Sequence, residues 1–410
     1  MHLIQLAGGQ AWPNLLPILA LRPSSVTFLT SSDPHHEYRD SIDSIHKACL
    51  ALGVRFAPTI VSTPSKYPTT DECRQELLKL NPDCINLTGG SKPMSIAAYD
   101  LAHQAHIPAF YIDTRRKDTP VEAVNHPGLD IKDQINAAFP QIIASITVPA
   151  ALRAHGFPVP IHFKSPPENW SAFASRAAEI RLDPAADKEI AHAVGQLRHQ
   201  LMGSANEMPK KGKLRTVLQI PISAPVGTAW QHYLSAACET GLLTSTETPS
   251  ATHQEFFLVC EDPITMQADA LRSLADENFK LLEGIWFELA LLAQLKLKSS
   301  FSDISWSVEA DHLQDSHASS RGETDLVAFN THALTLHFIS CKTTGPHGGA
   351  LDHIQGLRRR ATKEGGKFSK AELWIFRPKS DGHRRDLENH CKAQDVTLRI
   401  FTESIQSDNR

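Results

Sequence analysis

Along the first part of the chain, up to about residue 115, short apolar runs alternate with segments in which apolar residues recur at helical spacing. Short apolar runs predict strands at His2–Leu6, Ser25–Leu29, Val54–Pro58, Cys84–Leu87 and Pro108–Ile112, and the segments between them have helical spacing. Parallel strands need crossover helices and bury both faces, so this order predicts a mostly parallel sheet covered by helices. The N-terminal part of the chain is therefore expected to form an α/β domain.

A second ordered pattern begins near residue 276. It predicts a helix over 276–298, strands at 304–309, 324–329 and 334–341, a helix over 349–364, a strand at 372–376, a helix over 384–393 and a strand at 396–401. A helix and three strands, followed by alternating helices and strands, describe a second compact α/β unit with its own core.

The pattern weakens between these two units. Proline-rich pieces precede a helical stretch near 185–202 and a basic loop, P-K-K-G-K-L-R, at 209–215. We interpret this part as a linker region with partial structure. The chain then divides into residues 1–147, 148–265 and 266–410, which agrees with its length, because 410 residues exceed what one core normally serves.

Composition adds little about partners. The 41 Lys and Arg residues and 45 Asp and Glu residues give a net charge of -4, so no global basic field indicates nucleic acid, although local patches can exist. The seven cysteines never form C-x-x-C, so neither a disulfide framework nor a structural zinc site is expected. Since no signal-like segment and no apolar window of about 18 residues is found, we expect a cytoplasmic protein without a membrane partner.

The segment C-I-N-L-T-G-G-S-K-P-M-S, which starts at Cys84, passes from a predicted strand to a helix through two glycines and a lysine. Gly89 and Gly90 permit close backbone approach, so several N–H groups can converge on an anion, and Lys92 adds positive charge. On spacing alone, a phosphate cradle and a tight turn with a solvated lysine are equally good interpretations. A second glycine pair, at Ala7–Gln10, would lie at the same sheet edge, which favours a ligand site.

The stretch L-T-G-G-S-K-P-M-S resembles the signature of CARF domains, the CRISPR-associated Rossmann-fold sensors of cyclic oligoadenylates. The resemblance implies a Rossmann-like CARF domain that forms a homodimer, in which two copies of the loop hold one cyclic ligand, cyclic tetra-adenylate. The ligand-binding candidates that follow from it are Gln10, Thr88, Gly89, Gly90, Ser91, Lys92 and Pro93.

Charged residues of the C-terminal unit fall where the predicted elements can bring them together. Glu288 shares a helix face with small and apolar residues, where a charge is costly unless it is paired or binds a metal, although a glutamate at the margin of such a stripe is slightly more common. G-E-T-D places Glu323 and Asp325 on one strand face, and Ser340 and Lys342 share a face of the next strand. From these residues alone, a structural ion pair between Asp325 and Lys342 is the better interpretation.

The order of a helix glutamate, a strand aspartate and a strand x-x-Lys resembles the PD-(D/E)XK nuclease superfamily. More closely, G-x-W-x-E, G-E-x-D and I-x-C-K-T resemble the α/β nuclease domain that follows CARF in CRISPR ancillary nucleases of the DUF1887 type. The resemblance implies metal-dependent hydrolysis of DNA or RNA in type III CRISPR defence, with Glu288, Asp325, Ser340 and Lys342 as catalytic positions. Glu288, Asp325 and the Cys341 carbonyl would hold Mg²⁺ or Mn²⁺.

One position departs from that family. Ser340 stands where the family has a glutamate, and a neutral hydroxyl is a weaker metal ligand. We still favour an active nuclease, because Lys342, Asp325 and Glu288 are all kept. The alternative is a catalytically impaired sensor that binds nucleic acid in response to the same ligand. A third reading, a nucleotide-dependent metabolic enzyme, would require one of the standard phosphate-loop patterns, and the chain has neither.

Basic and histidine side chains surround the predicted site. A histidine can replace a missing ligand or base, and His332, His337, His347 and His353 are near in sequence, but chance proximity is the commoner reason in a chain with 21 histidines. His337 is expected on the opposite strand face from Ser340. A stripe made of Arg358, Arg359, Arg360, Lys363 and Lys367 suits phosphate contacts, and a solvated helix face explains it equally well.

Overall fold

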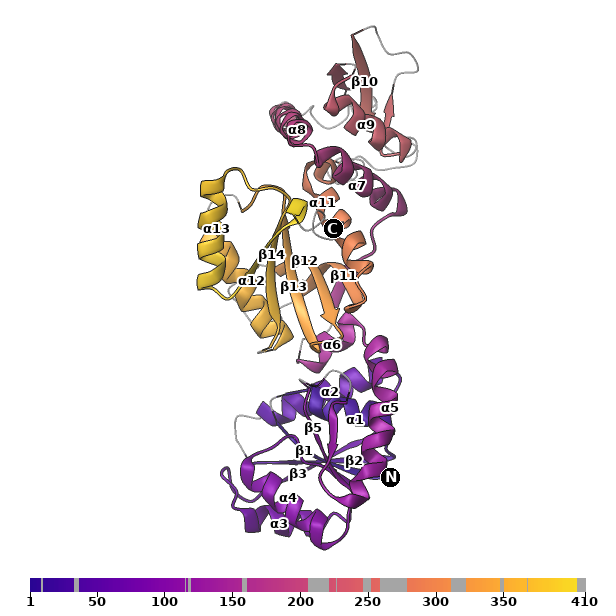
Figure 1. Cartoon of the computed structure of the whole chain (residues 1–410), viewed down its shortest axis with the longest axis vertical. Coiled ribbons are helices and arrows are strands. Elements are labelled where there is room, and N and C mark those ends of the chain that lie inside the picture. Colours follow the sequence, from indigo (N-terminus) through magenta and orange to yellow (C-terminus); the bar gives the residue numbers. More distant parts are fainter. Residues whose placement is uncertain are drawn as a thin grey trace, which may run out of the picture.

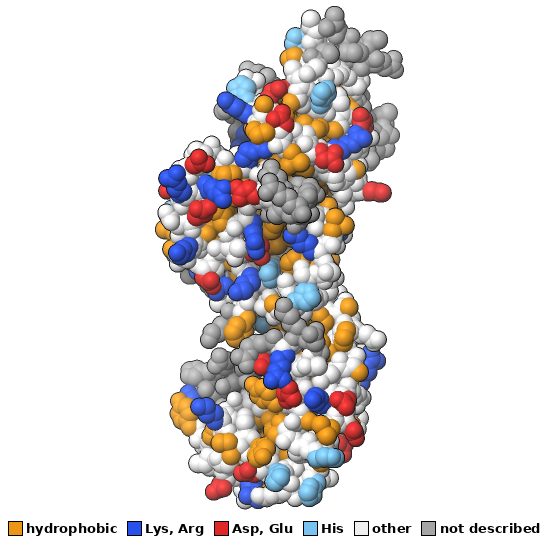
Figure 2. Space-filling model, in the orientation of Figure 1, with side chains coloured by type: hydrophobic (Ala, Val, Ile, Leu, Met, Phe, Trp, Pro, Cys, Tyr) orange, Lys and Arg blue, Asp and Glu red, His pale blue; other side chains and the backbone are white. Residues whose placement is uncertain are grey.

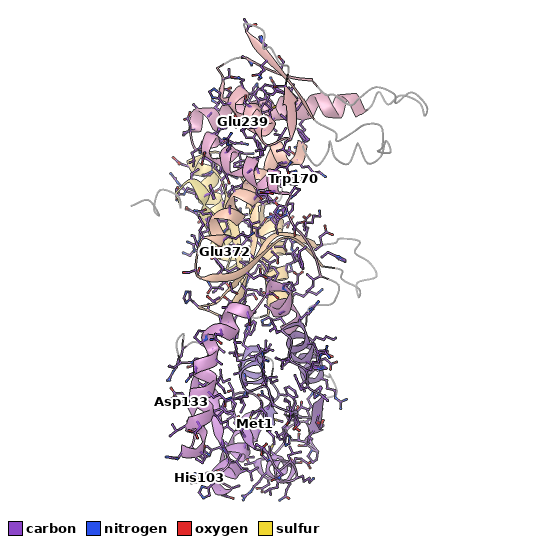
Figure 3. The ribbon with its side chains drawn as sticks, turned by 90° about the vertical axis from the view of Figure 1, so that its right-hand side faces the viewer. Met1, His103, Asp133, Trp170, Glu239 and Glu372 are labelled. Carbon is purple, nitrogen blue, oxygen red and sulfur yellow. The ribbon has the colours of Figure 1, made fainter. Side chains whose placement is uncertain are left out.

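The structure is a computed structural model that describes residues 1–8, 10–32, 37–114, 116, 119–156, 161–205, 221–225, 227–245, 252–258, 279–310, 322–346, 350–366 and 368–403. The molecule is elongated and consists of three bodies in a row (Figure 1). Met1 and His103 lie in the N-terminal body, Glu372 in the central C-terminal body and Glu239 in the body at the far end (Figure 3). The C-terminal sheet therefore lies between the N-terminal body and the body at the far end.

The N-terminal body is built on a six-stranded sheet in the order β3-β2-β1-β4-β5-β6. Its strands are β1 (His2–Leu6), β2 (Ser25–Thr30), β3 (Pro58–Ser62), β4 (Cys84–Asn86), β5 (Ala109–Ile112) and β6 (Val121–Ala123). The first five strands are parallel and β6 is antiparallel to β5. The helices are α1 (Trp12–Leu21), α2 (Glu37–Ala51), α3 (Thr70–Leu78), α4 (Lys92–Gln104) and α5 (Leu129–Ser145). The predicted parallel α/β domain is confirmed.

One predicted strand of this domain was wrong. The sequence indicated a strand at Val54–Pro58, whereas β3 begins at Pro58 and pairs with β2 from Val26 onward. Val54 and Phe56 are buried and their neighbours are exposed, so the loop before β3 alternates between buried and exposed residues as a strand does. The loop lacks the hydrogen bonds of a strand. Burial produced the pattern, and only the pairing with β2 decided where the strand lies.

The C-terminal body contains a second six-stranded sheet, in the order β15-β14-β13-β12-β11-β7. It consists of β7 (Ile161–Lys164), β11 (Phe301–Ala310), β12 (Gly322–Asn330), β13 (Thr335–Lys342), β14 (Lys370–Ile375) and β15 (Thr397–Ile400). β13, β14 and β15 are parallel, and the other pairings are antiparallel. A π-helical turn (Leu281–Ile285) and α11 (Trp286–Lys296) cover one face, while α12 (Ala350–Gly365) and α13 (Asp381–Ala393) cover the other. The predicted order of elements matches this second α/β unit.

The segment interpreted as a linker contains more structure than that interpretation implied. It carries α6 (Val148–Ala154), β7, α7 (Glu168–Arg181), α8 (Pro184–Ala205), α9 (Ala229–Glu239) and a three-stranded sheet of β8 (Pro221–Pro225), β10 (His253–Leu258) and β9 (Leu243–Ser245). β7 joins the edge of the C-terminal sheet beside β11, and α7 packs on α11. The predicted basic loop at 209–215 lies outside the described residues. The domain limits drawn from the sequence stay a prediction.

A continuous apolar cluster joins the N-terminal and C-terminal bodies, and we call it the joining core. It runs from Leu3 and Trp12 through Leu152 of α6 to Phe329 and Phe338 of the C-terminal sheet. The Trp12 ring lies 5.1 Å from the Phe329 ring and 5.8 Å from the His155 ring, as measured between centroids. Because interiors are close-packed, two bodies that share such a core move together.

Charges of both signs are interspersed over the visible surface, which agrees with the near-neutral composition (Figure 2). Among the described residues no single helix is long and apolar enough to cross a membrane. One bent pair, His126–Ser145 with Val148–Ala154, passes that test by length and composition only.

We expect Trp12→Ala to lower the free energy of unfolding by about 3–5 kcal/mol, because the substitution leaves a cavity where the two bodies meet. Urea unfolding followed by circular dichroism measures the change. Tyr67→Ala is the matched control, since that aromatic side chain is 83% exposed. Equal stability of the two variants would contradict a structural role for the Trp12 contact.

Candidate functional site

Two glycine loops meet at one edge of the N-terminal sheet, as the sequence predicted. β1 and β4 are parallel neighbours, so the loops that follow them emerge side by side. A Cβ atom on Gly8 would lie 3.2 Å from the Gly90 nitrogen, and one on Gly89 would lie 1.8 Å from the Leu6 carbonyl oxygen. Gly90 has φ 73°, a left-handed conformation that favours glycine. Close backbone packing therefore requires glycine at these positions.

A buried amide network supports both loops, and sequence reasoning missed it. The Asn86 amide donates to Gln5 Oε1 at 2.6 Å and to the Pro13 carbonyl at 2.8 Å, and the Gln5 amide donates to the Asn14 carbonyl at 3.0 Å. Gln5, Asn14 and Asn86 are almost fully buried. The signal was present in the strands H-L-I-Q-L and C-I-N-L, where a carboxamide interrupts an apolar run. Buried amides that satisfy one another hold a backbone in one arrangement.

The predicted ligand residues divide into supporting and accessible positions. Thr88 is a supporting residue, because its hydroxyl donates to Asn86 Oδ1 at 2.6 Å and accepts from the Ile112 N–H at 2.7 Å. Ser91 is the N-cap of α4, and Pro93 lies in its first turn. The exposed residues of the set are Gln10, Gly90, Ser91 and Lys92. The exposed loops thus lie beside the N-terminus of a helix, which favours bound anions.

The second site is centred on Asp325 at the junction of β12 and β13. Asp325 Oδ2 accepts hydrogen bonds from the Cys341 N–H at 2.6 Å, from Ser340 Oγ at 3.0 Å and from Lys342 Nζ at 3.2 Å. Lys342 Nζ also donates to the Cys341 carbonyl at 2.9 Å. The antiparallel register that pairs Leu326 with Ile339 brings these neighbouring positions together. The predicted encounter of Asp325 with Lys342 across the strands is confirmed.

Glu288 approaches this centre from α11. Its carboxylate accepts a hydrogen bond from Trp306 Nε1 at 2.8 Å. Burial first, and then the negative charge of Asp325, raise the pKa of Glu288 to about 8, while the Trp306 hydrogen bond and Lys342 act in the opposite direction. For Lys342, burial lowers the pKa, but Asp325 and Glu288 outweigh it, so the net pKa shift is upward and the ammonium stays charged. The site gathers carboxylates around one lysine.

A distortion of β11 contributes to the site. The pairing of β11 with β7 shifts register between Trp306 and Glu309, and Ser307 has φ 51°. The Ser307 hydroxyl donates to Glu323 Oε1 at 2.6 Å, which holds a third carboxylate near the first two. Bulges and left-handed residues outside glycine concentrate where a side chain must be aimed, so this distortion supports a functional interpretation of the cluster.

The oxygen atoms of the Asp325 site are donors of the kind that the predicted Mg²⁺ or Mn²⁺ prefers. Among the described residues, no group of three His, Cys, Asp or Glu side chains is placed to hold a metal ion by itself. Mg²⁺ commonly uses only one or two carboxylates and keeps several waters. Glu288 and Asp325 supply two hard carboxylates, and a bound divalent cation would offset the burial and the Asp325 charge that raise the Glu288 pKa. The residues present therefore fit such a cation, with the Cys341 carbonyl as a further oxygen donor.

The neighbouring histidines take different positions. His353 of α12 lies at the site, with Nε2 3.0 Å from Ser340 Oγ. His337 lies on the opposite strand face, as predicted, where its Nδ1 is 2.5 Å from Glu372 Oε1. His332 is exposed near the start of the β12–β13 turn, and His347 lies outside the described residues. Of the described histidines in this group, His353 is the one that contacts Ser340.

Two arginines of the predicted basic stripe make contacts within the fold. Arg358 donates to the Ser369 carbonyl at 2.9 Å and pairs with Asp395, and Arg360 donates to the Glu323 carbonyl. Arg359 is exposed, and Lys367 lies outside the described residues. Contacts within the fold use two of the three arginines, and phosphate binding by the stripe stays a prediction.

Comparison with known proteins identifies the N-terminal body. Residues 3–138 match the family model described as the Card1 CARF domain. The class of the N-terminal domain is therefore that of the Rossmann-like CARF domains, as its signature predicted. No match was found among the curated proteins.

Two solved structures have the fold of almost the whole chain. Protein VC1899 from Vibrio cholerae is 14% identical with a TM-score of 0.68, and Can2 from Sulfobacillus thermosulfidooxidans, solved in complex with cyclic tetra-adenylate, is 15% identical with a TM-score of 0.59. Each covers 99% of this chain, which covers 95% of each of them. The chain therefore shares the fold of these two proteins over almost its whole length, while a nuclease class for the C-terminal body and the roles of individual site residues stay predictions.

The raised pKa of Glu288 predicts a pH dependence of stability. Because the folded-state pKa lies above the ordinary 4.5, the folded state holds an extra proton up to about pH 8, and stability falls as the pH rises through this window. Glu288→Gln removes that ionisation. The variant should be more stable than the wild type by roughly 1–3 kcal/mol at pH 9, with little difference at pH 4.

Urea unfolding at the two pH values measures this difference. Glu168→Gln is the matched control, because Glu168 is exposed at the start of α7 and its effect should be the same at both pH values. A Glu288→Gln variant that loses stability equally at pH 4 and pH 9 would show that the carboxylate is not held against its charged neighbours.

Proposed function

We propose that the protein binds a cyclic oligoadenylate, cyclic tetra-adenylate, through its CARF domain in type III CRISPR defence and responds by cutting DNA or RNA at the Asp325 site. The match of residues 3–138 to the Card1 CARF domain supports the sensing half. The fold shared with Can2, which was solved with cyclic tetra-adenylate, supports the same ligand. The proposed cutting of DNA or RNA is supported by the close approach of Asp325, Lys342 and Glu288 at one centre.

The two glycine loops provide the chemistry that a cyclic nucleotide phosphate needs. Phosphates bind backbone N–H groups that converge at a helix N-terminus, and α4 begins at Lys92 directly after the second loop. Glycine at positions 8, 89 and 90 lets the loops approach closely, and Lys92 is exposed beside them. In the proposed homodimer, two such surfaces face one ring.

Lys342 and the carboxylates have different roles in the proposed hydrolysis. The Lys342 ammonium, positioned by Asp325 and by the Cys341 carbonyl, stabilises the negative charge that grows on the phosphate oxygens. Glu288, Asp325 and the Cys341 carbonyl would hold the cation. Mg²⁺ or Mn²⁺ bound there supplies a water of lowered pKa and neutralises phosphate charge. Trp306 orients Glu288 through its indole N–H.

A second candidate function follows from Ser340. Asp325 Oδ2 already accepts three hydrogen bonds, and a serine hydroxyl replaces the family's second carboxylate. These features favour an alternative in which the domain binds nucleic acid in response to the ligand and does not cut it. The two candidates share the sensor and differ only at the Asp325 site.

The joining core offers a route from sensor to site. Trp12 follows the first glycine loop, and its ring contacts Phe329 of β12, the strand that carries Asp325. A ligand shifts the equilibrium between two arrangements of a protein only if it binds one of them better than the other. Displacement of the first loop is therefore proposed to act on β12 through Trp12.

Gly89→Ala should weaken binding of cyclic tetra-adenylate at least 10-fold, because the added Cβ would overlap the Leu6 carbonyl and force the loop away from its position. Isothermal titration calorimetry with the purified full chain measures this. Gly195→Ala on α8 is the matched control, since a Cβ there meets no atom within 4 Å. Wild-type affinity of Gly89→Ala would remove the glycine loops from the ligand site.

Nuclease activity is tested with cyclic tetra-adenylate, Mn²⁺ or Mg²⁺, and labelled single-stranded and duplex DNA and RNA. We expect cleavage by the wild type, a loss of about 10²–10³-fold for Lys342→Met and comparable loss for Asp325→Asn, because each removes a charge from the reacting centre. Lys392→Met, an exposed lysine on α13, should cut like the wild type. If the wild type cuts no better than Asp325→Asn, the impaired sensor is the correct function.

A further inference from the structure

Ser340 connects Asp325 to a histidine that the family signature does not include. Its side chain is almost fully buried, with 4% of the residue exposed. Ser340 Oγ lies 3.0 Å from Asp325 Oδ2 and 3.0 Å from His353 Nε2. A buried hydroxyl is a poor partner for substrate, and Ser340 lies between its two neighbours and contacts both.

The two contacts of Ser340 fix where the protons lie. Asp325 Oδ2 accepts from the Cys341 N–H and from the Lys342 ammonium, so this oxygen is an acceptor. The single hydroxyl proton of Ser340 must then be donated to Asp325. His353 Nε2 consequently carries a proton and donates it to the Ser340 oxygen, which leaves the lone pair of a neutral imidazole on Nδ1.

The surroundings of His353 favour the neutral imidazole. It is half-buried on α12, and burial lowers its pKa below the ordinary 6.5. The charged groups that face it are Lys342 of β13 and Arg360 of α12, which lower the pKa further, and Asp325 of β12, which raises it. A neutral histidine whose tautomer is set by a neighbour is suited to accept a proton.

We propose that His353, held by Ser340, accepts the proton of the water that attacks the phosphodiester, and so replaces the carboxylate that the family has at position 340. The water oxygen bonds to phosphorus as the bond to the leaving sugar oxygen breaks. The water proton passes to His353 Nδ1, and the leaving oxygen takes a proton from solvent. His353 is the catalytic residue and Ser340 its positioning residue. This inference rests on the proposed nuclease function.

The test compares four variants for cleavage with cyclic tetra-adenylate and Mn²⁺. His353→Gln should lower kcat by about 100-fold with KM changed less than twofold, because removing a general base affects the chemical step. His332→Gln is the matched control and should equal the wild type, since His332 is exposed at the other end of β13. Ser340→Ala should lower kcat about 10-fold. Ser340→Glu combined with His353→Gln should recover at least 10-fold over His353→Gln alone, because the carboxylate returns.

Nitrogen-15 NMR of the imidazole adds a readout that is independent of cleavage. The wild type should show His353 as the Nε2–H tautomer, and Ser340→Ala should lose this preference. If the wild type and His353→Gln cut equally well, the role of His353 is overturned and the proposed nuclease function stands. A wild type that does not cut overturns the proposed nuclease function and this inference together. An Nδ1–H tautomer in the wild type also overturns the inference.

Discussion

The contact of Trp12 with Phe329 is the interaction on which the arrangement of the protein depends. Trp12 begins α1 directly after the first glycine loop, and Phe329 belongs to the strand that carries Asp325. Both rings are buried in the joining core. Close-packed interiors rearrange between discrete states and do not deform continuously. The first glycine loop is thereby connected to a charged site in another body through an apolar contact.

The charged site opposes the stability that the joining core provides. Glu288, Asp325 and Glu323 are gathered near each other, and one lysine balances them incompletely. In a cluster selected only for stability, like charges would lie apart or each charge would pair with an opposite one. The repulsion is characteristic of sites that bind cations or hold charge for a reaction. Ser340 adds no charge to this cluster and contacts His353.

Polar contacts attach the far body to the C-terminal body. Arg181 pairs with Asp187 at 2.7 Å, and its guanidinium lies 4.6 Å from the centre of the Trp286 ring, which belongs to α11. Arg377 donates to the Leu182 carbonyl at 2.8 Å. A buried charge without its partner is costly, so these contacts fix α7 and α8 against the C-terminal body. The segment between the two α/β units is thus a structural part of the protein.

The sequence by itself determined both α/β units, the glycine loops and the pairing of Asp325 with Lys342, because burial and side-chain alternation are written into local spacing. The signature around Gly89 also indicated the class of the N-terminal domain. Tertiary structure alone decided the position of β3, the addition of β7 to the second sheet and the approach of His353 to Ser340. These features depend on contacts between segments far apart in the chain, and no local pattern of residues specifies which distant partner a strand edge or a histidine will find.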